Sequence, residues 1–178
     1  GKTLGILGVG RVGGEVAKRA KSFNMRLLGY DPYLPAEIAE KLDVKLTSVD
    51  EVVSQADIIT IHAPLTPATE NMIDREQFEK MKPHALLVNV ARGGIVNEDA
   101  LYEALKEGLI AGAAFDVFVE EPLSMDSPLM SLDNLITTPH LGASTKEAQE
   151  KVSMEMAEHV IMFLKEGIIS NAINAPRG

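Results

Sequence analysis

Short apolar runs, many rich in Val and Ile, alternate along the chain with longer segments whose apolar residues recur at helical spacing. The short runs predict strands and the longer segments predict helices, because side chains repeat every second residue in a strand and about every 3.6 residues in a helix. This alternation is typical of a parallel sheet with helices on both faces. We place the strands at residues 4–7, 26–30, 44–46, 58–62, 85–90, 110–115 and 135–138.

The predicted fold class is therefore α/β: a doubly wound parallel sheet (Rossmann fold) of about seven strands with helices on both faces. The chain contains no internal repeat, low-complexity tract or Gly/Ser-rich linker. A chain of 178 residues is also an ordinary length for one domain. We expect residues 1–178 to form one compact unit.

Polar residues mark the ends of several predicted helices. Ser, Asp or Asn at a helix start accepts a hydrogen bond from a first-turn amide, and Gly suits the left-handed residue that ends a helix. The longest helix is expected over about residues 145–166, and its apolar stripe is interpreted as a packing face. The expected capping pairs are Ser48–Glu51, Ser144–Glu147 and Asp74–Gln77, with Asn97 at another start and Gly108 at its end.

Composition and charge narrow the classes of function. The chain has 17 Lys and Arg against 26 Asp and Glu, a net charge of -9 that would repel a nucleic-acid backbone. It has no Cys, so disulfides, a thiol nucleophile and thiolate metal sites are excluded. No apolar run approaches the roughly 18 residues of a membrane span, and the start is unlike a signal peptide. A small polar ligand and a cytoplasmic location are expected, with no metal, because no residue cluster has ligand spacing.

A glycine motif follows the first predicted strand. Gly8, Gly10 and Gly13 form G-x-G-x-x-G at the opening of a helix, and Asp31 ends the next strand 23 residues after Gly8. These glycines allow a tight turn, a close approach of the pyrophosphate and close helix packing, while Asp31 suits the adenosine ribose and repels a 2′-phosphate. The motif favours NAD over NADP. A simple glycine turn is the alternative, and Arg11 is either a phosphate contact or a solvated cation.

Polar residues also follow the last three predicted strands. Because the carboxyl ends of parallel strands line one crevice, these side chains are expected to converge beside the nicotinamide. Oxidation of a hydroxy acid needs a base for the hydroxyl proton and a two-donor clamp for the carboxylate, roles that suit His140 and Arg92. Glu121 is a candidate to orient the imidazole. Taken singly, each also fits another role: Arg92 and Glu121 as solvated surface charges, and His140 as a capping or core histidine. His62, at another strand end, is placed to line the cofactor cleft.

The segments GVGRVG, YDPY, HAPLT, NVARGG, FDVFVEEP and TTPHLGAST together resemble the D-2-hydroxyacid dehydrogenase family. PHLGASTKEAQ most resembles its D-3-phosphoglycerate dehydrogenase branch. The resemblance implies a catalytic trio of Arg92, Glu121 and His140. The cofactor contacts that it implies, beyond Gly8, Gly10 and Gly13, are Arg11 and Val12 at the phosphates, Asp31 at the ribose, Ala63, and Val90, Ala91, Arg92, Asp116, His140, Gly142 and Ala143 around the nicotinamide.

The resemblance also implies parts that this chain lacks. Members of the family carry a substrate domain, and some carry a regulatory domain, whereas this sequence starts at the first strand and ends at NAINAPRG. We therefore expect an isolated cofactor domain with little activity alone, which dimerises through itself. The activity implied for the whole protein is oxidation of D-3-phosphoglycerate to 3-phosphohydroxypyruvate in serine biosynthesis. The alternatives are an NAD(H)-sensing, corepressor-like interaction protein, a glyoxylate/hydroxypyruvate reductase, and an NAD-using hydrolase.

Overall fold

The computed structural model describes residues 1–172 and 174 of the chain. Its internal contacts form two compact units, Gly1–Pro139 and His140–Gly178, where the sequence predicts one compact unit. The assignment of all 178 residues to one dinucleotide-binding domain stays a prediction. The expected return of the chain at NAINAPRG falls partly on residues 173 and 175–178, which lie outside the described residues.

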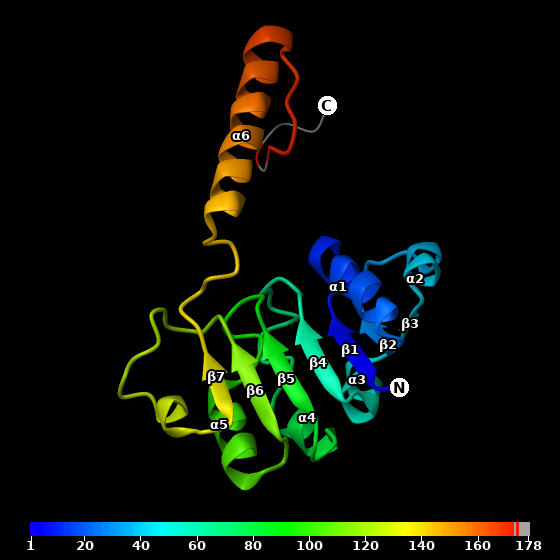
Figure 1. Ribbon diagram of the computed structural model, residues 1–178, viewed down its shortest axis with the longest axis vertical. Coiled ribbons are helices and arrows are strands. Elements are labelled where there is room, and N and C mark those ends of the chain that lie inside the picture. The colour runs from blue at the N-terminus through cyan, green and yellow to red at the C-terminus, as the bar shows by residue number, and fades with distance from the viewer. Residues whose placement is uncertain (173, 175–178) are drawn as a thin grey trace. The chain divides into compact units, whose positions relative to one another are not determined.

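The first unit is built around a parallel sheet of seven strands in the order β3-β2-β1-β4-β5-β6-β7 (Figure 1). The chain starts in the middle of the sheet, builds outward through β2 and β3, and then returns to the other side of β1. Open α/β sheets bind ligands at such a switch point, beyond the carboxyl ends of the strands. The strands are β1 (Thr3–Leu7), β2 (Arg26–Tyr30), β3 (Val44–Leu46), β4 (Ile58–Ile61), β5 (Leu86–Asn89), β6 (Gly112–Phe115) and β7 (Leu135–Thr137).

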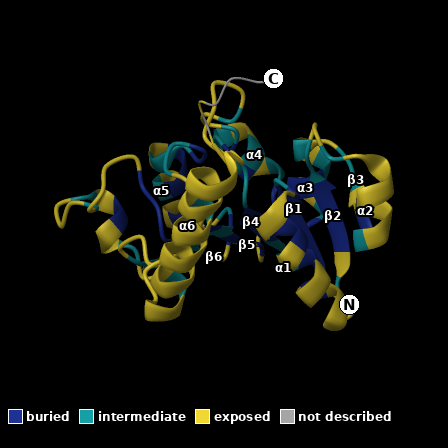
Figure 2. Ribbon diagram, turned by 90° about the horizontal axis from the view of Figure 1, so that it is seen from above, coloured by how far each residue is buried: buried dark blue, intermediate teal, exposed yellow. Residues whose placement is uncertain are grey.

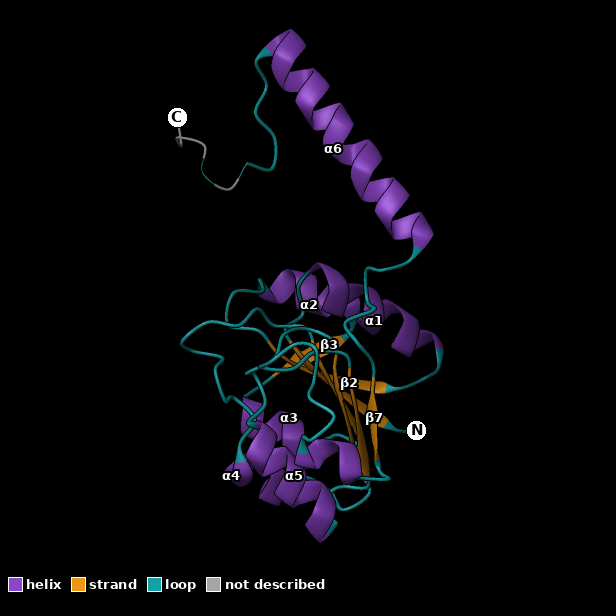
Figure 3. Cartoon of the chain, turned by 90° about the vertical axis from the view of Figure 1, so that its left-hand side faces the viewer, coloured by secondary structure: helices purple, strands orange, loops and turns teal. Residues whose placement is uncertain are grey.

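Helices cover both faces of this sheet, with α1 and α2 on one face and α3, α4 and α5 on the other (Figure 3). Each face has its own apolar core: Ile6 packs with Ala17 of α1, whereas Ile59 belongs to the larger cluster that contains Phe78 of α4. The buried positions lie in the strands and on the helix sides and connections that pack against the sheet (Figure 2). The helices of this unit are α1 (Arg11–Ser22), α2 (Ala36–Leu42), α3 (Val49–Gln55), α4 (Arg75–Lys80), α5 (Glu98–Glu107) and the 3-10 helix η1 (Pro128–Ser131).

The expected helix caps are confirmed at two starts, half confirmed at a third and corrected at a fourth. Asp74 and Gln77 form a complete capping box, and Asn97 accepts amide hydrogens of the first turn of α5, which ends at Gly108 in a left-handed conformation. Ser48 accepts the amide hydrogen of Glu51, as predicted, but the Glu51 carboxylate bonds Thr47, Lys45 and Gln55 instead of completing the box.

The predicted Ser144–Glu147 capping box is wrong by one residue. The cap of α6 (Lys146–Glu166) is Thr145, whose hydroxyl accepts the amide hydrogen of Ala148 at 3.1 Å. Ser144 instead donates from its hydroxyl to the carbonyl oxygen of His140 at 3.4 Å. Adjacent Ser and Thr are both good caps, so sequence alone does not choose between them.

α6 is the main element of the second unit, and none of its described residues is buried. Its apolar side chains include Val152, Val160, Phe163 and Leu164, which are 47% to 74% exposed. The sequence predicts that this stripe is a packing face, but it packs against no partner that buries it among the described residues. Within residues 1–172 and 174, α6 and the shorter helices all lack the combination of length and apolar character that crossing a bilayer requires.

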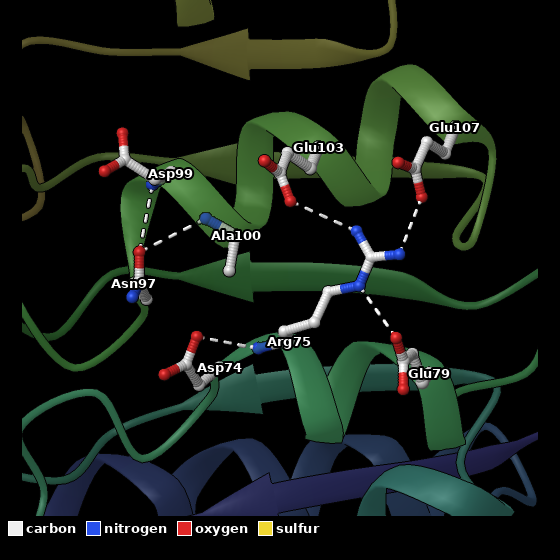
Figure 4. Close-up of polar contacts among 8 residues, drawn as sticks. All are labelled: Asp74, Arg75, Glu79, Asn97, Asp99, Ala100, Glu103 and Glu107. Atoms are coloured by element: carbon white, nitrogen blue, oxygen red, sulfur yellow. Dashed lines mark hydrogen bonds and ion pairs between the residues drawn. The ribbon is translucent and has the colours of Figure 1, made fainter.

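An arginine joins α4 to α5 on the surface of the first unit (Figure 4). Arg75 donates to Glu79 at 2.8 Å within α4, and to Glu103 at 3.1 Å and Glu107 at 2.9 Å on α5. The carboxylates raise the pKa of Arg75. Each exposed ion pair alone contributes little, but three acceptors around one planar fork fix how the two helices lie. Arg92 lies in the loop between β5 and α5. The contact of Arg75 with α5 therefore also fixes the end of this loop.

A partly buried carboxylate joins the amino ends of three strands, at the end of the sheet opposite the switch-point crevice. Asp57, just before β4, accepts hydrogen bonds from the Thr3 amide at 2.7 Å, Lys82 Nζ at 3.0 Å and His84 Nε2 at 2.9 Å. Its side chain is 13% exposed. The Thr3 amide, His84 and Lys82 hold the pKa of Asp57 well below its usual range.

Asp57→Asn is expected to lower the free energy of unfolding near neutral pH by about 1–3 kcal/mol, the usual contribution of hydrogen bonds to a charged group. Because the folded-state pKa is depressed, this stabilisation is complete above the ordinary Asp pKa of about 3.9 and is lost as the pH falls toward the folded value. Urea unfolding from about pH 7 to about pH 3 measures both effects. The stability difference between the two proteins should be constant at the upper end and shrink below about pH 4.

Asp43→Asn is the matched control, because Asp43 is 71% exposed and pairs only with Lys21 at 3.4 Å among the described residues. It should leave the stability nearly unchanged. Equal effects of the two substitutions would contradict the role assigned to Asp57.

Candidate functional site

The turn between β1 and α1 is held by two close backbone approaches. Gly8 has a φ of +91°, and a Cβ there would lie 2.6 Å from the amide nitrogen of Ala63 at the end of β4. A Cβ at Gly13 would lie 2.1 Å from the Gly8 carbonyl oxygen. Side chains cannot occupy these spaces, so both glycines are required by the packing of the protein itself.

Gly10 differs from the other two glycines of the motif. A Cβ at Gly10 would meet no atom of the described residues within 4 Å. Gly10 is also the cap of α1, where no described side chain accepts from the first-turn amides and no acidic residue lies in the first turn. The helix start therefore offers amide hydrogens beside open space, which fits an anionic group such as a pyrophosphate. Arg11 and Val12 are exposed at this same helix start.

Asp31 follows β2 and lies against the glycine turn. Its carboxylate accepts the amide hydrogen of Val9 at 2.9 Å on one oxygen and that of Tyr33 at 3.0 Å on the other. A carboxylate has about four acceptor positions, so both oxygens retain capacity for ribose hydroxyl groups. The structure shows that Asp31 holds the turn, and its contact with the ribose stays a prediction.

A cavity of about 610 Å³ begins at the glycine turn and reaches the loop after β5. Its lining is mainly apolar with few polar groups, as is usual for cofactor sites. The lining residues are Val12, His62, Ala63, Pro64, Leu65, Val90, Ala91 and Arg92. Val12, Ala63, Val90, Ala91 and Arg92 are cofactor contacts predicted from the sequence, and His62 lines this cavity as the sequence also predicts.

The loop that carries Arg92 is shaped by Asn89, which sequence reasoning missed. Asn89 is 1% exposed at the end of β5. Its side chain donates to the Arg92 carbonyl oxygen at 3.0 Å and accepts the Ala91 amide hydrogen at 3.1 Å. A buried amide side chain ending an apolar strand is the signal that would have identified it, because such a group must find partners in a loop.

The Arg92 loop packs directly against the segment that carries Glu121. A Cβ at Gly93 would lie 2.0 Å from the Phe118 carbonyl oxygen, so only Gly allows this contact. The Glu121 carboxylate accepts the Phe118 amide hydrogen at 3.1 Å, and the Glu98 carboxylate accepts that of Val119 at 2.7 Å. The structure thus brings together the loops of Arg92 and Glu121.

Asp116 is buried, whereas Arg92 and Glu121 are exposed. It is 7% exposed, and its carboxylate accepts the hydroxyl hydrogen of Thr138 from the end of β7. Its amide donates to the Asn89 carbonyl oxygen at 3.0 Å. Asp116 therefore joins the carboxyl ends of β5, β6 and β7.

His140, Gly142 and Ala143 belong to the second unit. His140 has a φ of +54°, and its carbonyl oxygen accepts from Ser144. The meeting of this segment with Arg92 and Glu121 stays a prediction. Among the described residues, no group of three or more His, Asp or Glu side chains has the geometry to hold a metal ion.

The arrangement of the first unit fits a dinucleotide. Helix amides and open space at Gly10 suit the pyrophosphate, Asp31 stands on the β2 side of the turn, and the cavity extends on the β4 side to Arg92. A guanidinium at the end of such a cavity suits a substrate carboxylate.

Comparison with known proteins agrees with this geometry. The family model described as "D-isomer specific 2-hydroxyacid dehydrogenase, NAD binding domain" matches residues 1–142. A D-3-phosphoglycerate dehydrogenase of Methanocaldococcus jannaschii is 52% identical over 99% of this chain and 34% of its own length. A glyoxylate reductase of Korarchaeum cryptofilum is 42% identical over 98% of this chain and 52% of its own length. The chain thus spans about a third of the phosphoglycerate dehydrogenases that it matches.

A solved structure shows the same fold. The crystal structure of D-lactate dehydrogenase with NAD+ from Lactobacillus jensenii superposes with a TM-score of 0.87 at 32% identity. The superposition covers 98% of this chain and 56% of that one. The doubly wound sheet predicted from the sequence is thereby confirmed.

Gly10→Ala is expected to leave the melting temperature unchanged, because the added methyl group meets no described atom within 4 Å. It should weaken NADH binding about tenfold or more, because the methyl group stands where the pyrophosphate approaches the backbone. Titration of NADH fluorescence, beside a thermal melt, measures both. Gly13→Ala should instead destabilise the fold, since its methyl group overlaps the Gly8 carbonyl oxygen. Full NADH affinity in Gly10→Ala would contradict the proposed path of the pyrophosphate.

Proposed function

The chain belongs to the D-isomer specific 2-hydroxyacid dehydrogenase family as its NAD-binding domain, and on this premise we propose that a protein containing it transfers a hydride between NAD and a D-2-hydroxy acid. The observation that carries the proposal is the cavity that joins the glycine turn to Arg92. One end suits the cofactor's phosphates and the other a substrate carboxylate. The proposed substrate is D-3-phosphoglycerate, oxidised to 3-phosphohydroxypyruvate in the cytoplasm as a step of serine biosynthesis.

When bound, NAD would supply the hydride acceptor for oxidation of the carbon that bears the hydroxyl group. Arg92, exposed at the end of the cavity, binds the substrate carboxylate through two parallel N–H donors. His140 takes the hydroxyl proton as the hydride leaves, and returns it in the reverse direction. Glu121 accepts a hydrogen bond from the imidazole and so fixes which ring nitrogen is free to take the proton.

Cofactor choice and turnover follow from neighbouring features. Asp31, already bound to the Val9 amide, would repel a 2′-phosphate, so the proposed cofactor is NAD rather than NADP. The 178-residue chain alone is proposed to turn over little, because substrate contacts and closure of the cleft come from a further domain. The relative that is a glyoxylate reductase makes a glyoxylate/hydroxypyruvate reductase the second candidate.

The catalytic assignment is tested in a full-length protein that carries this chain. His140→Ala is expected to lower kcat for NADH-dependent reduction of 3-phosphohydroxypyruvate by about 10²- to 10⁴-fold, the usual contribution of a general acid–base. Arg92→Ala should mainly raise KM for the keto acid, because the carboxylate loses its two donors. Steady-state kinetics with 3-phosphohydroxypyruvate and glyoxylate also decide between the two substrates.

Arg19→Ala is the matched control, since Arg19 is an exposed cation on α1 that pairs with Glu15 at 2.6 Å. Full activity of His140→Ala or Arg92→Ala would refute the assignment. Absence of reduction in the unmodified protein, together with NADH-dependent assembly with other proteins, would favour the corepressor-like alternative.

We further propose that the chain forms a homodimer through this domain. Large apolar side chains are exposed on α6 and also on the sheet strands, where Leu86 is 44% and Ile136 is 68% exposed. Exposed apolar surface of this kind is typical of interaction sites.

Light scattering of the 19.2 kDa chain is expected to give twice that mass at micromolar concentration. Ile136→Ser on the sheet and Phe163→Ser on α6 identify which surface is used. Lys45→Ser is the polar control, because the Lys45 side chain is 68% exposed. A mass of 19.2 kDa at every concentration would refute dimerisation through this domain.

A further inference from the structure

A threonine and a histidine share one face of β4 and its carboxyl end. The Thr60 hydroxyl group and the His62 Nε2 atom lie 2.9 Å apart. Thr60 is 7% exposed, and the His62 side chain is half-buried. The pair takes no part in the proposed hydride transfer, yet His62 lines the same cavity as Arg92.

The hydrogen bond fixes the tautomer of His62. Among the described residues, His62 Nε2 is the only hydrogen-bond partner of the Thr60 hydroxyl group. A buried hydroxyl hydrogen without an acceptor is costly, so Thr60 donates and Nε2 accepts. In a neutral imidazole one nitrogen accepts and the other carries the hydrogen. The hydrogen of His62 is therefore on Nδ1.

The same environment keeps the ring neutral. Burial lowers the pKa of His62 below its usual value of 6.5. Protonation of Nε2 would also place a second donor against the Thr60 hydroxyl group, whose hydrogen would then lose its acceptor. Near pH 7, His62 is therefore a neutral donor through Nδ1.

The position of His62 indicates which part of the dinucleotide would lie beside it. Asp31 follows β2, on one side of β1, and stands where the adenosine ribose binds, whereas β4 lies on the other side of β1. The cavity that His62 lines runs from Val12 at the α1 start to Arg92. His62 thus lies between the place of the pyrophosphate and the place of the reacting carbon.

We propose that His62 is a cofactor-binding residue that donates from Nδ1 to an oxygen of the nicotinamide-side ribose of NAD, with Thr60 orienting the ring. The inference rests on the assignment of this cavity to the dinucleotide in the proposed function. A neutral donor suits this place because the nicotinamide ring is cationic in NAD+ and neutral in NADH. A cationic imidazole beside it would disfavour NAD+ in particular.

Two amide substitutions of His62 distinguish the roles of its two ring nitrogens. Asn places its side-chain nitrogen near the position of Nδ1, and Gln places its amide near that of Nε2. His62→Gln should therefore keep a partner for Thr60 but lose the donor to the cofactor, and should raise the Kd for NADH about five- to tenfold. His62→Asn should keep most of the affinity. Thr60→Val should weaken binding by a smaller factor, because the ring loses its orientation.

NADH fluorescence titration of the 178-residue chain measures these Kd values, with thermal melts as a check of folding. His84→Gln is the control, because His84 bonds Asp57 at the opposite end of the sheet. If the unmodified chain binds NADH and His62→Gln binds equally well, the role of His62 is refuted while the proposed function stands. If the folded, unmodified chain does not bind NADH, the assignment of the cavity is refuted, and the role of His62 with it.

A pH series gives a readout that a purely structural role would not change. Arg92 is the cationic side chain among the residues that line this cavity. Between about pH 7 and about pH 5, protonation of His62 should weaken NAD+ binding more than NADH binding. Because His140 is also proposed to lie beside the nicotinamide, the comparison is made in a His140→Ala background, where His62→Asn should remove that difference. An unchanged difference in His62→Asn would overturn the proposal.

Discussion

The cofactor site depends on close contact between backbone segments at the point where the strand order reverses. A Cβ at Gly8 would lie 2.6 Å from the Ala63 amide nitrogen, and one at Gly13 would lie 2.1 Å from the Gly8 carbonyl oxygen. No side chain separates β1, β4 and α1 there, so the start of α1 lies directly at the crevice. Among the described residues, no side chain caps the first amides of α1, and they remain available to a ligand. Asp31 then fixes the turn from the β2 side through the Val9 amide.

The loops beyond β5 and β6 are held mainly through their backbone atoms. Asn89 bonds the Arg92 carbonyl oxygen, Gly93 allows contact with Phe118, and Glu121 accepts the Phe118 amide hydrogen. The loops are thereby fixed without using the Arg92 guanidinium as an ion-pair partner among the described residues. It bonds the Ala91 carbonyl oxygen at 2.6 Å and otherwise retains donors for a ligand. Backbone contacts hold this loop in place, so the positive charge of Arg92 is not neutralised by an ion pair with the described residues.

The two ends of the sheet differ in how completely their polar groups are satisfied. At the amino ends, Asp57 accepts from an amide, a lysine and a histidine, and its role is structural. At the carboxyl ends, Gly10 borders open space and Arg92 is exposed beside a cavity. The stabilising carboxylate and the guanidinium proposed to bind the substrate therefore lie at opposite ends of the sheet.

The sequence by itself determined the seven strands, the glycine turn with Asp31, and the polar strand ends, because periodicity and the need for Gly at a tight turn are local properties of the chain. Only the tertiary structure decided the roles of Asn89 and Gly93 and the pairing of His62 with Thr60. Each of these depends on an atom of a neighbouring strand face or loop: the Arg92 carbonyl oxygen, the Phe118 carbonyl oxygen and the Thr60 hydroxyl group. Hydrogen bonds and backbone contacts of this kind are set by three-dimensional packing, which residue spacing does not encode.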